Sequence, residues 1–161
     1  TDVEEFFWKT FCDLYLEIVK WRVYNGTKQE KESAFYTLYI SLLTILKLMA
    51  PFTPFITEEI YQEYFKTNEK DKSIHISEWP KIKISDLMND KSDKIVWQAL
   101  LDVITKVRQE KSKEQKPMNA EIVLTLSKED YVLLKTGFLE DLKHVTNARE
   151  IKEGKFKVEF V

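Results

Sequence analysis

The stretch LKLMAPFTPFITEEIY, residues 46–61, decides the fold because it describes the end of one helix and the immediate start of another. Apolar residues leading into it recur at steps of four, three and four, which is the spacing of one buried helix face: Leu38, Leu42, Ile45 and Met49. Pro51 ends that helix because its ring removes a backbone donor and collides with the previous turn. Thr53 is then expected to serve as the N-cap, with Pro54 at the first helical position. The stretch therefore predicts a corner between two packed helices.

The same helical period runs through most of the first 117 residues. We predict helices over residues 1–24, 31–50, 54–65 and from about 90–92 to 111. The first carries two neighbouring apolar stripes, which indicates packing on two sides. The expected core residues are Phe55, Ile56, Ile60 and Tyr64 in the third helix, and Val96, Leu100, Val103 and Val107 in the fourth. Residues 66–72 are expected to form an exposed loop, and 74–76 an extended segment that Trp79 holds against the helices.

The apolar period changes from helical to two after Pro117. Residues 122–126 alternate as in a strand, and Ser127 is placed to cap a helix over 128–142. A hairpin is predicted from 145–151 and 155–161, turning at Glu153-Gly154, with Phe156, Val158 and Phe160 facing the helix. The chain therefore divides into a helical bundle over 1–117 and a small β-α-β-β unit over 118–161.

The composition fits a soluble globular protein, with 43% hydrophobic and 32% charged residues. No apolar run approaches the roughly 20 residues of a membrane span, and no basic-then-apolar leader opens the chain. We therefore expect a cytoplasmic protein with no membrane partner. The single cysteine, Cys12, lies within an apolar stripe and is expected to be a buried, inert thiol. His75 and His144 have no Cys or carboxylate neighbour at ligand spacing, so no metal site is expected.

Four segments, in this order, resemble the anticodon-binding helical region of the class I aminoacyl-tRNA synthetases for valine, isoleucine and leucine. They are FCDLYLEIVKWRVY (11–24), the corner LKLMAPFTPFITEEIY (46–61), SIHISEWP (73–80) and VRQEKSKEQKPMNAEI (107–122). Lys111-Ser112 and Met118-Asn119-Ala120 favour the valine enzymes, in their archaeal-like form, over the isoleucine and leucine enzymes.

The resemblance implies a mainly α fold, in which an anticodon-binding helical bundle is followed by a small α+β unit. It implies that the family's first helix is absent and that the chain is a fragment of a ligase. Its partners would be tRNA, that of valine, and the rest of the synthetase chain. Neither nucleotide-binding signature of the family occurs, the His-Ile-Gly-His type or the Lys-Met-Ser-Lys-Ser type. We therefore expect no catalytic site and no cofactor in this chain, with ATP used by the full-length enzyme only.

Seven basic residues are the candidates for RNA contact: Lys20, Arg22, Lys106, Arg108, Lys111, Lys113 and Lys116. The positive excess supports the last five, because residues 66–119 carry twelve Lys/Arg against nine Asp/Glu, whereas 1–65 carry six against ten. A solvated helix end is the plainer interpretation of such a cluster. A phosphate-contacting loop beside the anticodon stem is the alternative. Trp21 and Tyr24 are candidates for stacking on an unpaired base, although Trp21 lies on an apolar stripe, which favours the core.

Two classes of function stay open from the sequence. The first is recognition of the anticodon arm, which supports aminoacylation without catalysing it. The second is a free-standing helical module that binds protein, for which the acidic first 65 residues and the wide apolar arc of the first helix are suited. Because the family's preceding helix would cover part of that arc, we also expect self-association through the N-terminal helix.

Overall fold

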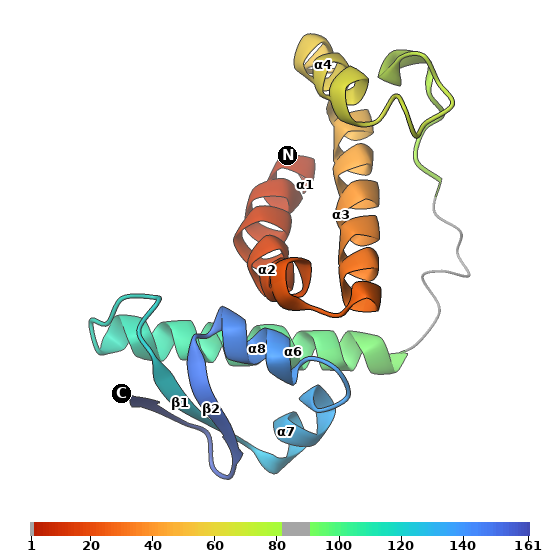
Figure 1. Ribbon diagram of the computed structural model, residues 1–161. Helices are drawn as coiled ribbons and strands as arrows, with labels where there is room; N and C mark the ends of the chain where they lie inside the picture. Colours follow the sequence, from red (N-terminus) through yellow and green to blue (C-terminus); the bar gives the residue numbers. More distant parts are fainter. Residues whose placement is uncertain (1, 82–90) are drawn as a thin grey trace. The chain divides into compact units, whose positions relative to one another are not determined.

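The computed structural model describes residues 2–81 and 91–161, and the chain is mainly helical with one small sheet, as predicted. It divides into two compact units, Thr1–Leu87 and Met88–Val161 (Figure 1). The boundary expected after Pro117 therefore falls inside the second unit. The physical reason is that the long helix before it, α6, packs on the helices α7 and α8 that follow β1, and so shares their core.

The first unit begins with one continuous helical segment, made of α1 (Asp2–Glu5), a π-helix η1 (Phe6–Tyr15) and α2 (Leu16–Asn25). At the end of η1 the Leu16 N–H donates to the Phe11 carbonyl, five residues back. This wider winding changes which residues share a face, so each of the two predicted stripes is buried only in part. Phe11, Ile18 and Val19 are buried, whereas Trp8 is 58% exposed.

Helix α3 (Lys28–Met49) lies beside α2 and runs back along it (Figure 1). It begins earlier than predicted because Thr27 and Glu30 form a capping box. The Glu30 N–H donates to the Thr27 hydroxyl, and the Thr27 N–H donates to a Glu30 carboxylate oxygen at 2.8 Å. The predicted start at residue 31 is therefore too late, although the Thr-x-x-Glu spacing is present in the sequence.

The corner leads at once into α4 (Pro54–Tyr64), with Pro54 at its first position as predicted. Thr53 occupies the N-cap position but does not cap. Its hydroxyl donates backward to the Met49 carbonyl at 3.2 Å instead of accepting from the new helix. The role predicted for Thr53 is therefore wrong in its chemistry, although the helix starts where expected.

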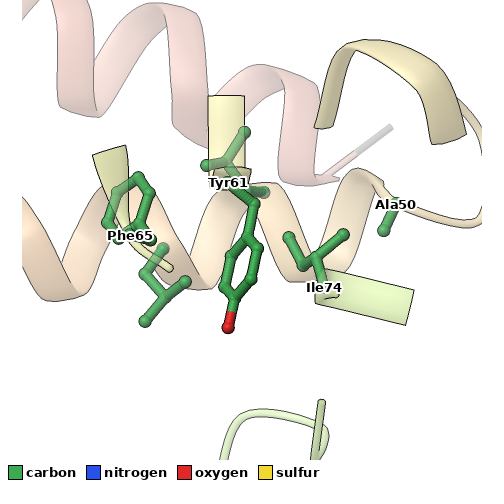
Figure 2. Packing of buried hydrophobic residues seen from close by; sticks show 6 residues of the cluster. Ala50, Tyr61, Phe65 and Ile74 are labelled. Atoms are coloured by element: carbon green, nitrogen blue, oxygen red, sulfur yellow. The ribbon is translucent and has the colours of Figure 1, made fainter. Parts of the chain in front are cut away.

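The face of α4 that packs on α3 is only partly the predicted one, because Ile60 packs against the core but the other three expected residues do not. Thr57, Tyr61 and Phe65 are buried, whereas Phe55 is 90% exposed, and Ile56 and Tyr64 also lie in solvent. Figure 2 shows the Tyr61 ring between the Phe65 and Ile74 side chains, in a core that also holds Leu43, Leu46 and Ala50. Apolar residues occur on both sides of this helix, so periodicity alone did not distinguish the buried side.

The segment after α4 is tied to it by polar contacts. The Tyr61 hydroxyl donates to the Asp71 carbonyl at 2.9 Å. Glu58 accepts from the Ser73 hydroxyl at 2.8 Å and from the Ile74 N–H at 3.0 Å. Residues Ile74–Ile76 form a 3₁₀ turn, η2, where an extended segment was predicted. The buried Ile74 holds it in place, not Trp79, which is 58% exposed.

The second unit contains α6 (Lys91–Lys113), β1 (Ile122–Leu126), α7 (Lys128–Leu134), α8 (Leu139–Val145), β2 (Ala148–Glu153) and β3 (Lys157–Phe160). Ser127 caps α7, accepting from the Asp130 N–H at 3.1 Å, as predicted. The single helix predicted over 128–142 is divided in two, because Gly137 has a φ of 153°, a conformation that a helix does not contain.

The strand order is β2-β1-β3, with β1 parallel to β2 and antiparallel to β3. The predicted hairpin of the last two strands is therefore wrong, because β1 lies between them. The chain leaves β2 and crosses the end of β1 through Gly154, whose N–H donates to the Leu126 carbonyl at 2.7 Å. A Cβ at Gly154 would lie 2.9 Å from the Thr125 methyl group, so this close crossing favours glycine.

The core of the second unit is largely the one predicted. The α6 residues Leu100, Val103 and Val107 are at most 1% exposed. On the sheet, Ile122, Leu124 and Leu126 are completely buried, and Val123 and Thr125 on the other face are only partly covered. The buried residues of β1 and of α6 thus belong to one core, as expected for a sheet that is covered on one face.

Candidate nucleic-acid interface

The basic residues predicted to contact RNA fall into both units. Lys20 and Arg22 lie on α2 in the first unit. The other five lie on α6 or in the segment that follows it. The structure gives these seven side chains different environments, and only some of them can reach a phosphate.

Lys111 is buried, which corrects its predicted role. Its side chain is 1% exposed. The ammonium group donates to three backbone carbonyls, those of Met118 at 2.7 Å, Ala120 at 2.9 Å and Thr146 at 2.7 Å. An ammonium has three hydrogens, so no donor remains for a phosphate. Burial also lowers the pKa of Lys111.

The sequence did contain a signal for this burial. Lys111 is four residues after Val107, and so continues the buried stripe of α6 by one further helical step. The stripe ends on a lysine whose alkyl stem lies among apolar groups and whose head satisfies chain carbonyls at the junctions before β1 and after α8. Lys111 is therefore a structural residue of the second unit.

Lys106 and Lys116 are the exposed cations of this region with the best-defined positions. The Lys106 ammonium lies 5.7 Å from the centre of the Phe156 ring, and that of Lys116 lies 5.8 Å from the centre of the Phe160 ring. In the part of the chain that the structure describes, neither forms an ion pair with a carboxylate. Both charges are therefore directed at solvent and available to an anion.

Two other lysines of the set are exposed but already paired. Lys20 binds both carboxylate oxygens of Glu17, at 2.6 and 2.7 Å. Lys113 lies 3.7 Å from a Glu110 oxygen. Exposed pairs of this kind contribute about 1 kcal/mol or less, so a phosphate can compete for either lysine. Each is nevertheless a weaker candidate than Lys106 or Lys116.

The two arginines, Arg22 and Arg108, are half-buried. Arg22 lies near Glu30, whose pKa is held below its usual value first by the hydrogen bonds from Thr27, with a smaller contribution from the Arg22 charge. Near it, Tyr24 is 73% exposed and Trp21 is half-buried. Of the two aromatic candidates for stacking, only Tyr24 presents most of its ring to solvent.

Cys12, His75 and His144 are the side chains that could act as a nucleophile or as metal ligands, and their surroundings do not favour either role. The pKa of the Cys12 thiol is raised, first by desolvation and then by the Asp13 charge, so it is a poor nucleophile. His75 Nε2 lies 3.2 Å from the Pro54 carbonyl and 4.0 Å from Glu58, and His144 lies 3.7 Å from Glu140. Each histidine thus has a carboxylate neighbour, contrary to prediction. Within residues 2–81 and 91–161, however, no group of three metal-ligating side chains occurs.

No sequence pattern indicated the two phenylalanines that lie beneath the lysines. Phe156 and Phe160 were assigned to the strand face that packs on a helix, and both are half-buried. Strand alternation placed them on one face, but no local pattern links residues 156 and 160 to residues 106 and 116.

No helix described in the structure is long and apolar enough to cross a membrane.

Comparison with known proteins gives a consistent result. Residues 1–126 match the family described as "Anticodon-binding domain of tRNA ligase". The chain is 40% identical over 153 residues to a valine–tRNA ligase of Orientia tsutsugamushi (strain Boryong). The matched region is 92% of this chain and 18% of that protein. It is 39% identical over 166 residues to a valine–tRNA ligase of Rickettsia rickettsii (strain Sheila Smith). Here the matched region is 98% of this chain and 19% of that protein. The chain therefore spans less than a fifth of the length of these relatives.

Proposed function

Since the chain belongs to the family of anticodon-binding domains of tRNA ligases, we propose that it binds the anticodon arm of valine tRNA within a valine–tRNA ligase. The names of the relatives support the choice of valine. The role is positional: this segment binds the anticodon arm while other parts of the enzyme, with ATP, activate the amino acid and transfer it. A cytoplasmic location follows from this role and is part of the proposal.

The structural observation that best supports the proposal is the pair of exposed lysines, Lys106 and Lys116. Phosphate contacts dominate the affinity of proteins for nucleic acids and make it depend on salt. Unpaired bases of a loop, such as the anticodon, add stacking and edge contacts. On the first unit the Tyr24 ring, near the end of α2, is exposed and suited to such stacking. We propose these residues, with Lys20, Lys113 and Arg108, as the RNA-contacting set, and we leave Lys111 out.

We expect the double variant Lys106→Ala/Lys116→Ala to bind a valine tRNA transcript more weakly and with less dependence on salt. Each lost phosphate contact should reduce the log–log salt slope by roughly 0.7 to 0.9. The measurement is fluorescence anisotropy over a salt series. Lys128→Ala/Lys135→Ala is the matched control, because both lysines are exposed in the same unit and removing them changes the net charge equally. Its slope should stay at the wild-type value.

Three results of this experiment would contradict the proposal at different points. An unchanged slope in Lys106→Ala/Lys116→Ala would show that the two lysines are only solvated surface. Equal affinity for isoleucine or leucine tRNA transcripts would contradict the choice of valine. A wild-type chain that binds no tRNA at low salt would contradict RNA binding by this segment and favour a protein-binding role.

We also propose that the chain self-associates through its N-terminal helix. Phe6 is 46% exposed and Trp8 58% exposed on this segment. A groove of about 510 Å³ between α1 and α3 is lined mainly by apolar residues, among them Val3, Phe6 and Leu48. Exposed apolar surface of this kind favours association, and a twofold dimer is the simplest product. Sedimentation at rising concentration should show mass above the monomer, and Trp8→Lys should lower it. A strict monomer at high concentration would contradict this proposal.

A further inference from the structure

The last strand of the sheet carries two aromatic rings that lie beneath two exposed lysines, Lys106 on α6 and Lys116 in the segment after it. Phe156 immediately precedes β3 and Phe160 ends it, with Val158 between them, and all three side chains are half-buried. Alternation along extended chain places them on one face. Four residues of extended chain separate the two rings by roughly 13 Å. The strand therefore offers two flat apolar supports at a defined spacing.

One lysine lies over each support. Lys106 comes from the exposed side of α6 and lies over Phe156, and Lys116 comes from the segment after α6 and lies over Phe160. The face of an aromatic ring carries partial negative charge, so it attracts an ammonium group without neutralising it as a carboxylate would. By contrast, the nearby Lys113 lies 3.7 Å from a Glu110 oxygen. The two ring-supported lysines are thus oriented without an ion pair among the described residues.

A lysine that is already oriented loses less conformational entropy on binding a phosphate than a mobile lysine does. A lysine side chain loses considerable rotamer freedom when it is fixed, and this loss normally reduces the gain from a surface contact. Where a ring already restricts the side chain, part of that loss has occurred before the ligand arrives. The two rings therefore improve phosphate binding without touching the phosphate.

We propose that Phe156 and Phe160 are positioning residues of the RNA-binding surface, which hold Lys106 and Lys116 for contact with two phosphates of the tRNA. This inference rests on the proposed function. It extends the candidate surface from α6 to the last strand of the second unit.

A double-mutant cycle tests the inference. Phe156→Leu/Phe160→Leu keeps apolar side chains at both positions but removes the rings. From the usual strength of exposed cation–π contacts, each lost ring should weaken binding of a valine tRNA transcript by roughly two- to fivefold. Introduced into the Lys106→Ala/Lys116→Ala background, the same change should have no further effect, because the rings act only through the lysines. Phe156→Tyr/Phe160→Tyr, which retains both ring faces, should bind like wild type.

The controls separate positioning from packing and from failure of the proposed function. Val158→Ala alters the same strand face without changing a ring, and should leave tRNA affinity unchanged while urea unfolding confirms that the chain is folded. The positioning role is wrong, even though RNA binding stands, if Phe156→Leu/Phe160→Leu binds like wild type. It is also wrong if this change weakens binding as much in the Lys106→Ala/Lys116→Ala background as in the wild-type chain. If the wild-type chain does not bind the transcript, the proposed function itself is wrong.

Discussion

Lys111→Met should destabilise the second unit by about 2 to 5 kcal/mol, because it leaves the buried Thr146 carbonyl and two partly buried carbonyls without a donor. Methionine preserves the apolar stem, so the substitution tests the ammonium group and not the volume of the side chain. Three carbonyls depend on that group, those of Met118, Ala120 and Thr146. They belong to the segment before β1 and to the end of α8, so one side chain connects α6 to both. The loss is therefore expected to affect the whole unit.

Urea unfolding measures this prediction, with amide hydrogen exchange of β1 to assign the loss to the second unit. Lys113→Met is the matched control. It removes the same charge two residues later from an exposed side chain, and should change the free energy of unfolding by less than about 0.5 kcal/mol. Equal stability of the two variants would show that water replaces the ammonium group and that Lys111 is not structurally required.

Tyr61→Ala should have the largest effect in the first unit, a loss of about 3 to 5 kcal/mol in the free energy of unfolding. The Tyr61 side chain is completely buried between α3, α4 and η2, and its hydroxyl donates to the Asp71 carbonyl. Tyr61→Phe removes only that hydrogen bond and should cost about 1 kcal/mol. The difference between the two variants measures the packing of the ring alone.

Phe55→Ala is the informative comparison for Tyr61→Ala, because helical periodicity predicts Phe55 in the core and the structure leaves it 90% exposed. The change should alter stability by less than about 0.5 kcal/mol. Both residues are aromatic and lie on α4, so helix propensity differs little between the two experiments. A loss of several kcal/mol in Phe55→Ala would show that the predicted face of α4 is buried after all.

The sequence predicted the elements better than the partners of those elements. Pro51 and Pro54 determine where two helices meet, and Ser127 determines where a third begins, because each acts on its own neighbours in the chain. Strand pairing depends on residues far apart in sequence. Adjacent strands with a glycine turn predict a hairpin, whereas the observed placement of β1 between them depends on packing that no local pattern records.

The same distinction explains the outcome for the candidate site. A run of lysines indicates positive charge but not its exposure, which depends on the tertiary structure. Lys111 points into the core and Lys113 to the surface, although only one residue separates them, because the helix rotates by about 100° per residue. Lys106 and Lys116 gain their supports from β3 and the residue before it, which lie far from them in the sequence but next to them in the fold.

The central place of β1 also sets the order in which the second unit can fold as it is synthesised. Both strands that pair with β1 follow it in the chain, and Ile122 finds its antiparallel partner only at Phe160. A nascent chain that has emerged only as far as β1 therefore carries a strand with two unpaired edges. Contacts so distant in sequence slow folding, whereas α2 and α3 of the first unit pair through one short turn. Completion of the second unit thus waits for its last residues to leave the ribosome.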